Sequence, residues 1–581
     1  MKKTFKRLSS AIISAAMFIS AGITVMPSFA ADYTVTIQKP SGSNDTAQHT
    51  YEAYQIFAGD LSGEGDDAVL ASIEWGTGIN NETFITALKA STAFGETNPF
   101  AACTTAQSVA DIIDEWEPDN AANTDKDKHK AYIQAFADIA ASNLTEVKTA
   151  GTKGNNKLTL STAGYYLIKD KNGSLDEQKL GAYSDYMLKV VDTVTITAKE
   201  DVPTIEKKIL ENSTLKEANT ASIGDVVTFQ LNSVVPDMSA YDKYFFVIND
   251  KMCEGLTFKS SSVKIYIGDS TSPIDSTYYQ VQTNQAETDG YTFQIVMNNF
   301  KANYGNKAGQ PIKVTYDATL NEKADGTDNG NVNTVNLTFS NNPNVKQNGT
   351  NEPSGDDPKG TTPDSKTKTY TTGILLRKVD GSDNALTGAV FELKGTGVKK
   401  IVVTTVDGFK EDANGKYYKL KDGTYTIYPP TDTNGDLYDE ANKKYTLVTT
   451  TLNSSGSGAD SCVSQTVDSL GIISFFGLGT GTYYLTETKA PPQYNKLANP
   501  IKIEITANPT FTSPNWTIKR DGSVLTAPNG IYEFKVVNNK GVTLPGTGGS
   551  GTAIFYIIGG IMVTGAFVLL ITKKRMTNKE K

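Results

Sequence analysis

The sequence predicts a mainly all-β protein of tandem immunoglobulin-like β-sandwiches, with helices added to the first domain. The chain has 581 residues, enough for several domains. Short runs of β-branched and aromatic residues alternate with Gly, Asn and Asp turns over much of its length. Apolar residues at helical spacing occur near 109–116 and 133–144. These three observations give the fold class.

The N-terminal segment is predicted to be a signal peptide, residues 1–30. Its basic part lies at 2–7 and its apolar part at 11–25, and small residues stand at Ser28 and Ala30. A retained membrane anchor is the weaker alternative. Export of the chain is therefore expected.

The C-terminal segment, 542–581, carries a pentapeptide, an apolar stretch at 553–571 and a basic tail at 573–575. The stretch has about the length of a bilayer span, and the tail should stay cytoplasmic. The pentapeptide consists of Leu544, Pro545, Gly546, Thr547 and Gly548. In this order the three parts resemble the cell-wall sorting signal of Gram-positive surface proteins. The resemblance implies that a sortase cuts after Thr547 and holds it as a thioester.

Three domains are expected between these ends. Residues 31–200 begin with an alternating strand at Val35 and Ile37, continue with the helical segments and close with strands. Residues 201–342 and 370–541 have the pattern of β-sandwiches. The polar, Pro- and Gly-containing segment 343–369 is predicted to be a linker.

A hydrophilic insertion near 405–465 interrupts the third domain. It contains Asp432, Asn434 and Asp436, part of a calcium-loop pattern, but Leu437 stands where that loop needs glycine. A solvated acidic loop is the better interpretation, and no metal site is predicted.

Charge and composition exclude several classes of function. The formal net charge is −9, and the two basic ends carry +4 each, so the remaining body carries −17. Such a body does not suit nucleic acid, which needs a basic face. The chain has two histidines and three cysteines, too few for a disulfide framework or a His-rich metal site. No set of nucleophile, His and acid points to an enzyme, and no cofactor is expected.

In the third domain a lysine, a carboxyl and an amide each continue an apolar row, since residues two apart in a strand share a face. Lys378 follows Ile374 and Leu376, Glu487 follows a second such row, and Asn538 follows a third. Buried Lys and Glu are rare unless paired. Two interpretations remain open: a buried salt bridge beside an amide, or an intramolecular isopeptide bond. Asn539 points to the opposite face.

The second domain repeats this arrangement. Lys207 shares a face with Ile205 and Ile209, whereas its rival Lys208 faces away. Asp250 continues the apolar row of its strand, and Asn341 continues the row that ends at Phe339.

These segments resemble the domains of sortase-assembled backbone pilins of Gram-positive bacteria, the Spa-type fimbrial subunits. LLRKVDGSDNALTGAVFELKG, YYLTETKAPPQY and FKVVNN are similar to a Cna-B-type domain, with Gln493 where the family has glycine. VPTIEKKI, FFVINDKMCEGLTF and LTFSNNP resemble a Cna-A-like domain. The resemblance implies two isopeptide bonds, each with a carboxyl group as autocatalyst: Lys378–Asn538 with Glu487, and Lys207–Asn341 with Asp250.

Burial accounts for the implied chemistry. Desolvation should lower the pKa of Lys378, so that its amine is neutral and nucleophilic. The same apolar surroundings should keep Glu487 protonated, ready to bind the Asn538 carbonyl and to move protons as ammonia leaves.

The first domain departs from this pattern. Lys39 is predicted to be solvated, Lys169 aligns where Glu487 stands, and no isopeptide bond is expected. Lys199 resembles the lysine of the pilin motif WxxxVxVYPK, although Val190 replaces the Trp and Thr197-Ala198 replace Tyr-Pro.

The resemblance identifies a pilus backbone subunit, in which Lys199 of one copy attacks the sortase thioester at Thr547 of the next. The expected partners are sortase, further copies of the chain and peptidoglycan, with minor pilins and host ligands left open. The alternative is a monomeric wall-anchored adhesin. Both interpretations place the chain at the cell surface, and neither makes it an enzyme.

Overall fold

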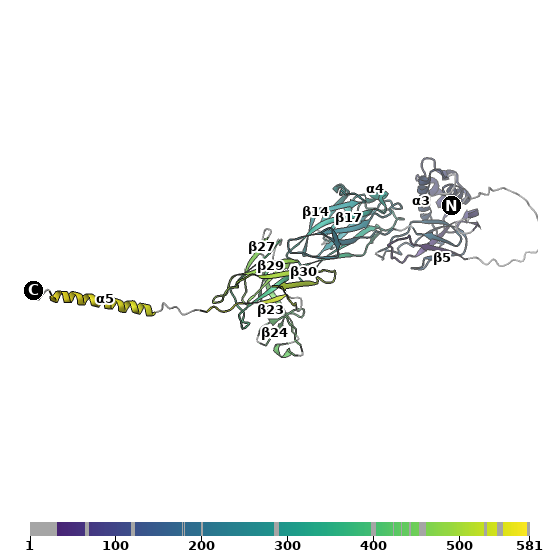
Figure 1. Ribbon diagram of the computed structural model, residues 1–581. Coiled ribbons are helices and arrows are strands. Elements are labelled where there is room, and N and C mark those ends of the chain that lie inside the picture. Colours follow the sequence, from purple (N-terminus) through teal and green to yellow (C-terminus); the bar gives the residue numbers. More distant parts are fainter. Residues whose placement is uncertain are drawn as a thin grey trace, which may run out of the picture.

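The computed structural model describes residues 32–577, apart from gaps at 64–68, 118–122, 177, 179, 199–200, 284–289, 397–401, 422, 424, 432, 441–442, 453–459, 528–531 and 543–549. Three β-rich domains lie in a row, and helix α5, Ser550–Thr577, stands apart at the C-terminal end (Figure 1). The predicted all-β class is confirmed.

Domain 1 packs a small sheet of order β5-β1-β8 against a larger one of order β3-β2-β6-β7, with β4 paired to β2. Val35 and Ile37 are buried between the sheets, as their alternation predicts. The strands are β1 Tyr33–Gln38, β2 Tyr51–Ser62, β3 Val69–Trp75, β4 Thr149–Ala150, β5 Lys157–Leu160, β6 Gly164–Asp170, β7 Met187–Val191 and β8 Val194–Thr197.

The helices of domain 1 lie near the predicted places. The helices are α1 Asn81–Ala90, η2 Pro99–Ala102, α2 Ala106–Asp114 and α3 Lys126–Ala141. Thr105 caps α2 and Asp125 caps α3 by accepting a backbone N–H bond. Both helices end before the last residue of the apolar pattern. Trp116 lies in the turn after α2, and Leu144 forms an isolated antiparallel bridge with Ile79.

Domain 2 is a sandwich of two sheets with one apolar core between them. The sheet orders are β10-β9-β12-β17-β14 and β11-β20-β18-β13-β16-β15, with β19 paired to β18. The elements are β9 Glu206–Glu211, β10 Thr214–Lys216, β11 Ala218–Thr220, β12 Val226–Val234, β13 Phe246–Met252, β14 Leu256–Ile267, η3 Ser276–Tyr278, β15 Tyr279–Thr283, β16 Phe293–Met297, α4 Phe300–Tyr304, η5 Gly305–Lys307, β17 Pro311–Leu320, β18 Asn331–Ser340, β19 Lys359–Thr361 and β20 Ser365–Tyr370.

The segment 343–369 is not the linker that its composition predicts. It packs on domain 2 and supplies β19 and β20, and β20 lies between β11 and β18. Thr367 and Thr369 of β20 are fully buried. Domain 2 therefore extends to Tyr370, and β21 of domain 3 starts two residues later.

Domain 3 is a second sandwich, with sheets of order β26-β23-β28-β21-β33 and β27-β22-β29-β30-β31-β32. The insertion adds a small two-stranded sheet of β24 and β25, and its Asp432 lies outside the described residues. The elements are β21 Thr372–Val379, β22 Val390–Thr396, β23 Val402–Glu411, β24 Tyr418–Lys419, β25 Tyr425–Thr426, η6 Gly435–Leu437, β26 Tyr445–Leu452, β27 Asp460–Thr466, β28 Ile472–Leu478, β29 Gly481–Lys489, β30 Ile501–Ala507, β31 Trp516–Arg520, β32 Ser523–Val524 and β33 Glu533–Val537.

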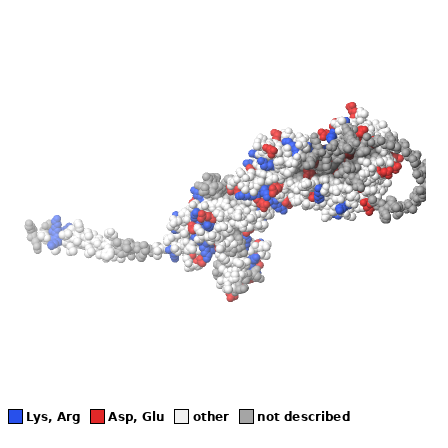
Figure 2. Space-filling model, turned by 45° about the vertical axis from the view of Figure 1, so that its right-hand side comes forward, with Lys and Arg blue, Asp and Glu red and all other residues white. Residues whose placement is uncertain are grey.

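Basic and acidic side chains are interspersed over the face of the domains shown in Figure 2. Helix α5 is different, since its apolar side chains are exposed along its length and its last turn holds Lys574 and Arg575. Residues Ala553–Thr577 are long and apolar enough to cross a membrane.

Candidate functional sites

A lysine, a carboxyl group and an amide meet in the core of domain 2. Lys207, on β9, points between the sheets and is 1% exposed. Its Nζ lies 2.7 Å from Oδ2 of Asp250, on β13, and 2.5 Å from Oδ1 of Asn333, on β18. A nucleophile, an acid and an amide electrophile are thus in mutual reach.

Tyr316, on β17, completes this cluster, and the sequence analysis missed it. Its hydroxyl donates to Asp250 Oδ2 at 2.5 Å and accepts from Asn333 Nδ2 at 3.0 Å. The Lys207 Nζ lies 5.6 Å from the Phe229 ring centroid and 5.8 Å from that of Tyr316. Tyr316 continues the apolar row of Val314, so by sequence alone it reads as an ordinary core aromatic.

The pKa values in this cluster follow from burial. Desolvation lowers the pKa of Lys207 to about 8, against the opposing effect of the Asp250 carboxylate. Burial raises the pKa of Asp250, although Lys207 and Tyr316 partly offset this. Both shifts favour a neutral amine beside a neutral carboxylic acid.

Asn341 is not the amide of this site, which corrects the sequence-based assignment. It shares a strand face with Asn333 but lies eight residues further on, about 26 Å along an extended chain. Asn341 instead joins domain 1 to domain 2, because its carbonyl accepts from Tyr183 N at 2.7 Å and its Nδ2 donates to Gly181 O at 3.3 Å. The face was predicted correctly, but the register was not.

Domain 3 brings together the three residues predicted for it, and they form its buried polar site. The parallel pairing of β21 with β33 sets Lys378 opposite Val536, so Asn538 follows two residues on along the same face. Asn538 Nδ2 donates to Glu487 Oε1 at 2.7 Å, and Leu497 N donates to Glu487 Oε2 at 2.7 Å. The side chains of all three are buried, with residue exposures of 0% for Lys378, 2% for Glu487 and 1% for Asn538.

Lys378 is also a buried lysine, but its hydrogen bonds within the described part of the chain go to backbone carbonyl oxygens, including that of Val379 at 3.4 Å. Its Nζ donates to the carbonyl oxygen of Val536 at 2.9 Å. Burial lowers the pKa of Lys378 to about 8, and the Glu487 carboxylate opposes that shift. The amine is therefore far easier to deprotonate than a surface lysine.

Lys39 and Lys169 of domain 1 have different surroundings from Lys207 and Lys378. The side chain of Lys39 is 42% exposed and lies 3.5 Å from Asp45, in agreement with its predicted solvation. Lys169 is buried, lies opposite Glu52 in the sheet and donates to Asn172 Oδ1 at 2.6 Å. Asn172 is exposed, so this contact belongs to a surface turn.

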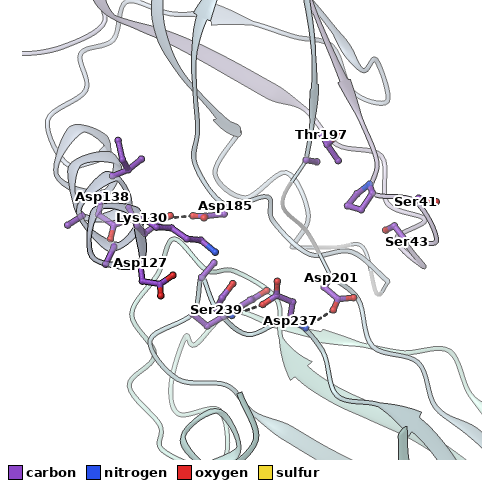
Figure 3. A pocket seen from close by; sticks show the side chains of 18 of the residues that line it. Ser41, Ser43, Asp127, Lys130, Asp138, Asp185, Thr197, Asp201, Asp237 and Ser239 are labelled. Atoms are coloured by element: carbon purple, nitrogen blue, oxygen red, sulfur yellow. Dashed lines mark hydrogen bonds between the residues drawn. The ribbon is translucent and has the colours of Figure 1, made fainter. Parts of the chain in front are cut away.

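The cleft at the junction of domains 1 and 2 has a volume of about 950 Å³ (Figure 3). Ala198 and Asp201 line it, and Lys199, between them, lies outside the described residues. Its charged lining consists of Lys130, Asp127, Asp138, Asp185, Asp201 and Asp237. The pentapeptide Leu544, Pro545, Gly546, Thr547 and Gly548 also lies outside the described residues.

Comparison with known proteins agrees with this architecture. A family model described as Gram-positive pilin backbone subunit 2, Cna-B-like domain, matches residues 223–343. A prealbumin-like fold domain matches 436–520, and the LPXTG cell wall anchor motif matches 536–578. The trypsin-resistant surface T6 protein of Streptococcus pyogenes serotype M6 is 26% identical over 459 residues, covering 74% of this chain and 78% of that protein.

The chain belongs to the Gram-positive backbone pilins. As a pilin with a C-terminal LPXTG anchor and an apolar helix, it is a cell-wall-anchored surface protein, and the anchor implies sortase and peptidoglycan as partners. Its relatives are structural pilus subunits. The description of the matched model assigns the middle domain of the pilin to the Cna-B-like type, which differs from the Cna-A-like type expected from its sequence.

Two solved pilin structures align with this chain at TM-scores below 0.5. The T6 backbone pilin of Streptococcus pyogenes serotype M6 aligns with a TM-score of 0.46 and 16% identity, over 88% of this chain and 98% of that one. The major pilin SpaD of Corynebacterium diphtheriae aligns with a TM-score of 0.41 and 16% identity, over 88% and 97%.

Proposed function

We propose that this pilin forms the shaft of a covalent pilus and that each of its last two domains closes a Lys–Asn isopeptide bond of its own. The bonds are Lys207–Asn333, with Asp250 as catalyst, and Lys378–Asn538, with Glu487 as catalyst. The observation that carries the proposal is the 2.5 Å approach of Lys207 Nζ to the side-chain carbonyl oxygen of Asn333. Asn333 replaces Asn341 in this proposal.

The reaction follows from the surroundings of the lysines. A neutral amine attacks Cγ of the asparagine, the carboxyl group supplies and takes up protons, and ammonia leaves. Each bond forms once per chain, so the carboxyl group acts without turnover. The buried site keeps water from competing for the amide.

The bonds would stabilise an extracellular chain that has too few cysteines for a disulfide framework. Each links an early strand of its domain, β9 or β21, to a late one or to the residue that follows it. A cross-link closing a loop of more than a hundred residues stabilises by roughly 5 kcal/mol in the chain-entropy account. Unlike a disulfide, it does not respond to reductant.

The subunits would be joined by amide bonds between Lys199 and Thr547. Lys199 lies in sequence between Ala198 and Asp201, two residues that line the interdomain cleft. Minor pilins and host ligands are further candidate partners of the assembled fibre.

Gel analysis of wall extracts tests the proposed polymer. Lys199→Ala should abolish the high-mass ladder and leave monomer anchored through Thr547, whereas Thr547→Ala should abolish both. Lys171→Ala, which removes another exposed lysine of domain 1, is the matched control and should keep the ladder. A wild-type extract with monomer alone would favour the adhesin alternative, and a normal ladder from Lys199→Ala would move the linkage to another lysine.

A further inference from the structure

The two isopeptide sites differ in how the carboxyl group reaches the nitrogen that must leave. In domain 3, Glu487 contacts Asn538 Nδ2 directly, at 2.7 Å. In domain 2, the hydrogen bonds given by the described residues lead from Asp250 to Asn333 only through Lys207 or through Tyr316. The leaving nitrogen, Asn333 Nδ2, is held by Tyr316.

Packing of the Tyr316 ring in the core holds its hydroxyl group in position. Tyr316 is 1% exposed and its ring stacks on Phe229 at 5.4 Å between centroids. Phe293 meets the ring edge-on at 5.2 Å. The hydroxyl oxygen therefore stays 2.5 Å from Asp250 Oδ2 and 3.0 Å from Asn333 Nδ2.

We propose, resting on the isopeptide bond proposed above, that Tyr316 is a catalytic residue that relays the proton of Asp250 to the departing nitrogen of Asn333. Neutral Lys207 Nζ forms a bond to Asn333 Cγ, which becomes tetrahedral as the C=O π pair moves to Oδ1, and Nδ2 becomes pyramidal with a free electron pair. The pair on Oδ1 re-forms the C=O bond when ammonia leaves. Tyr316 gives its proton to Nδ2 and takes that of Asp250. The C–Nδ2 bond then breaks and ammonia leaves.

The proton balance closes without any co-reactant. Of the two protons on the neutral Lys207 amine, one stays on the new amide and one passes to Asp250 Oδ2, which lies 2.7 Å away. Asp250 and Tyr316 both end protonated, as they began. Reversal of the hydroxyl hydrogen is a rotation about the C–O bond and moves no heavy atom.

The environment of Tyr316 favours a relay over a free phenolate. Burial and the neighbouring Asp250 raise the pKa of Tyr316 well above its ordinary value. The phenol can therefore give up its proton only while it receives another. Domain 3 has direct contact between acid and leaving nitrogen, so it needs no such residue.

The test is the rate of ammonia loss in the mature chain, residues 31–547, carrying Tyr316→Phe. The intact mass of newly synthesised chain is measured at successive times after synthesis, and each bond that forms lowers it by about 17 Da. The variant should close the Lys378–Asn538 bond at the wild-type rate and the Lys207–Asn333 bond roughly a hundredfold more slowly. Tyr244→Phe is the matched control, because it removes a hydroxyl that is buried in the same core and has no hydrogen-bond partner among the described residues. It should lose both ammonias normally.

The outcomes separate the relay from the bond itself. Loss of two ammonias from Tyr316→Phe on the wild-type time course overturns the relay, whereas a wild-type chain without the Lys207–Asn333 bond overturns the bond. A second arm guards against misfolding of the variant. With 3-fluorotyrosine at position 316, which keeps the hydroxyl and makes it more acidic, the bond should form at the wild-type rate or faster, and slower formation also overturns the relay.

Discussion

Lys207 and Lys208 are neighbours on β9, and the pleat of the strand sends them into opposite surroundings. The side chain of Lys207 is 0% exposed beside Asp250, whereas that of Lys208 is 21% exposed and pairs with Glu206 and Glu217. Surface pairs of the second kind contribute little to stability. Only the buried lysine has the lowered pKa and the amide neighbour that bond formation requires.

The first prediction concerns this pair. Lys207→Met keeps the apolar stem but removes the nucleophile, so the ectodomain should retain one ammonia, about 17 Da, relative to wild type. Domain 2 should also melt at a lower temperature, because a cross-link worth roughly 5 kcal/mol is lost. Lys208→Met is the control and should differ from the wild-type mass only by the Lys-to-Met exchange itself, with both ammonias lost. A Lys207→Met mass that differs from wild type only by the residue exchange, with no retained ammonia, would exclude Lys207 as the bonded residue.

The second prediction concerns pH. In the reactive state the Lys207 amine is neutral and the Asp250 carboxyl group is protonated. The pair then carries one proton fewer than when the ammonium and the carboxylic acid are both present. Above about pH 8, the pKa of Lys207, the pair loses that remaining proton, and bond formation should slow about tenfold per pH unit. Below the raised pKa of Asp250 the pair gains a proton and the rate should fall again. Pulse-chase mass spectrometry should give a bell-shaped profile, and a rate still rising at pH 9 would contradict the mechanism.

At the scale of strands, the sequence predicts which side chains face the core. It does not predict the register, that is, which residues of neighbouring strands lie opposite one another. The two-residue alternation predicted that Lys378, Glu487 and Asn538 enter one core, and they do. The same alternation could not separate Asn333 from Asn341, since both lie on one face. The choice depends on cross-strand pairing, which sets Asn333 opposite Met252 on β13.

Strand β20 was missed for a different reason. Its sequence, SKTKTY, is polar, and the preceding residues contain the Pro and Gly of a connector. Its threonines nevertheless suit a pleated strand, and the fold buries them between β11 and β18. A polar composition indicates that a segment tolerates solvent. Whether the segment becomes a central strand depends on the strands that pair with it.

The third prediction concerns this strand. Backbone amides of 365–370 should exchange with deuterium far more slowly than those of an unstructured peptide, because β20 pairs with β18 along 365–369 and with β11 along 368–370. Peptide-level hydrogen exchange by mass spectrometry makes the measurement. Exchange at the rate of an unstructured peptide would show that 343–369 is a linker after all.

Across the whole molecule, the domains are connected by specific contacts as well as by the chain. Gly181 and Tyr183 of domain 1 bind Asn341, and Ile223 N of domain 2 donates to Gly477 O of domain 3 at 3.0 Å. Gly479 N also donates to Ser222 Oγ at 3.0 Å. Each pair of neighbouring domains in the row of Figure 1 is thus joined by hydrogen bonds.

The fourth prediction separates the joint from the isopeptide site. Asn341→Ala removes the hydrogen bond to Gly181 but leaves the Lys207 cluster intact. Both ammonias should still be lost, while amides of 181–184 exchange faster. Retention of one ammonia in this variant would restore Asn341 as the bonded residue.

The proposed isopeptide bonds would cross-link the pilin to itself at two defined pairs of side chains. Intact-mass measurement of the purified ectodomain, followed by tandem mass spectrometry of its proteolytic fragments, tests them most directly. We expect a mass about 34 Da below that of the sequence, equal to two ammonias, and fragments that join Lys207 to Asn333 and Lys378 to Asn538. A mass equal to that of the sequence, or a fragment joining Lys207 to Asn341, would contradict it.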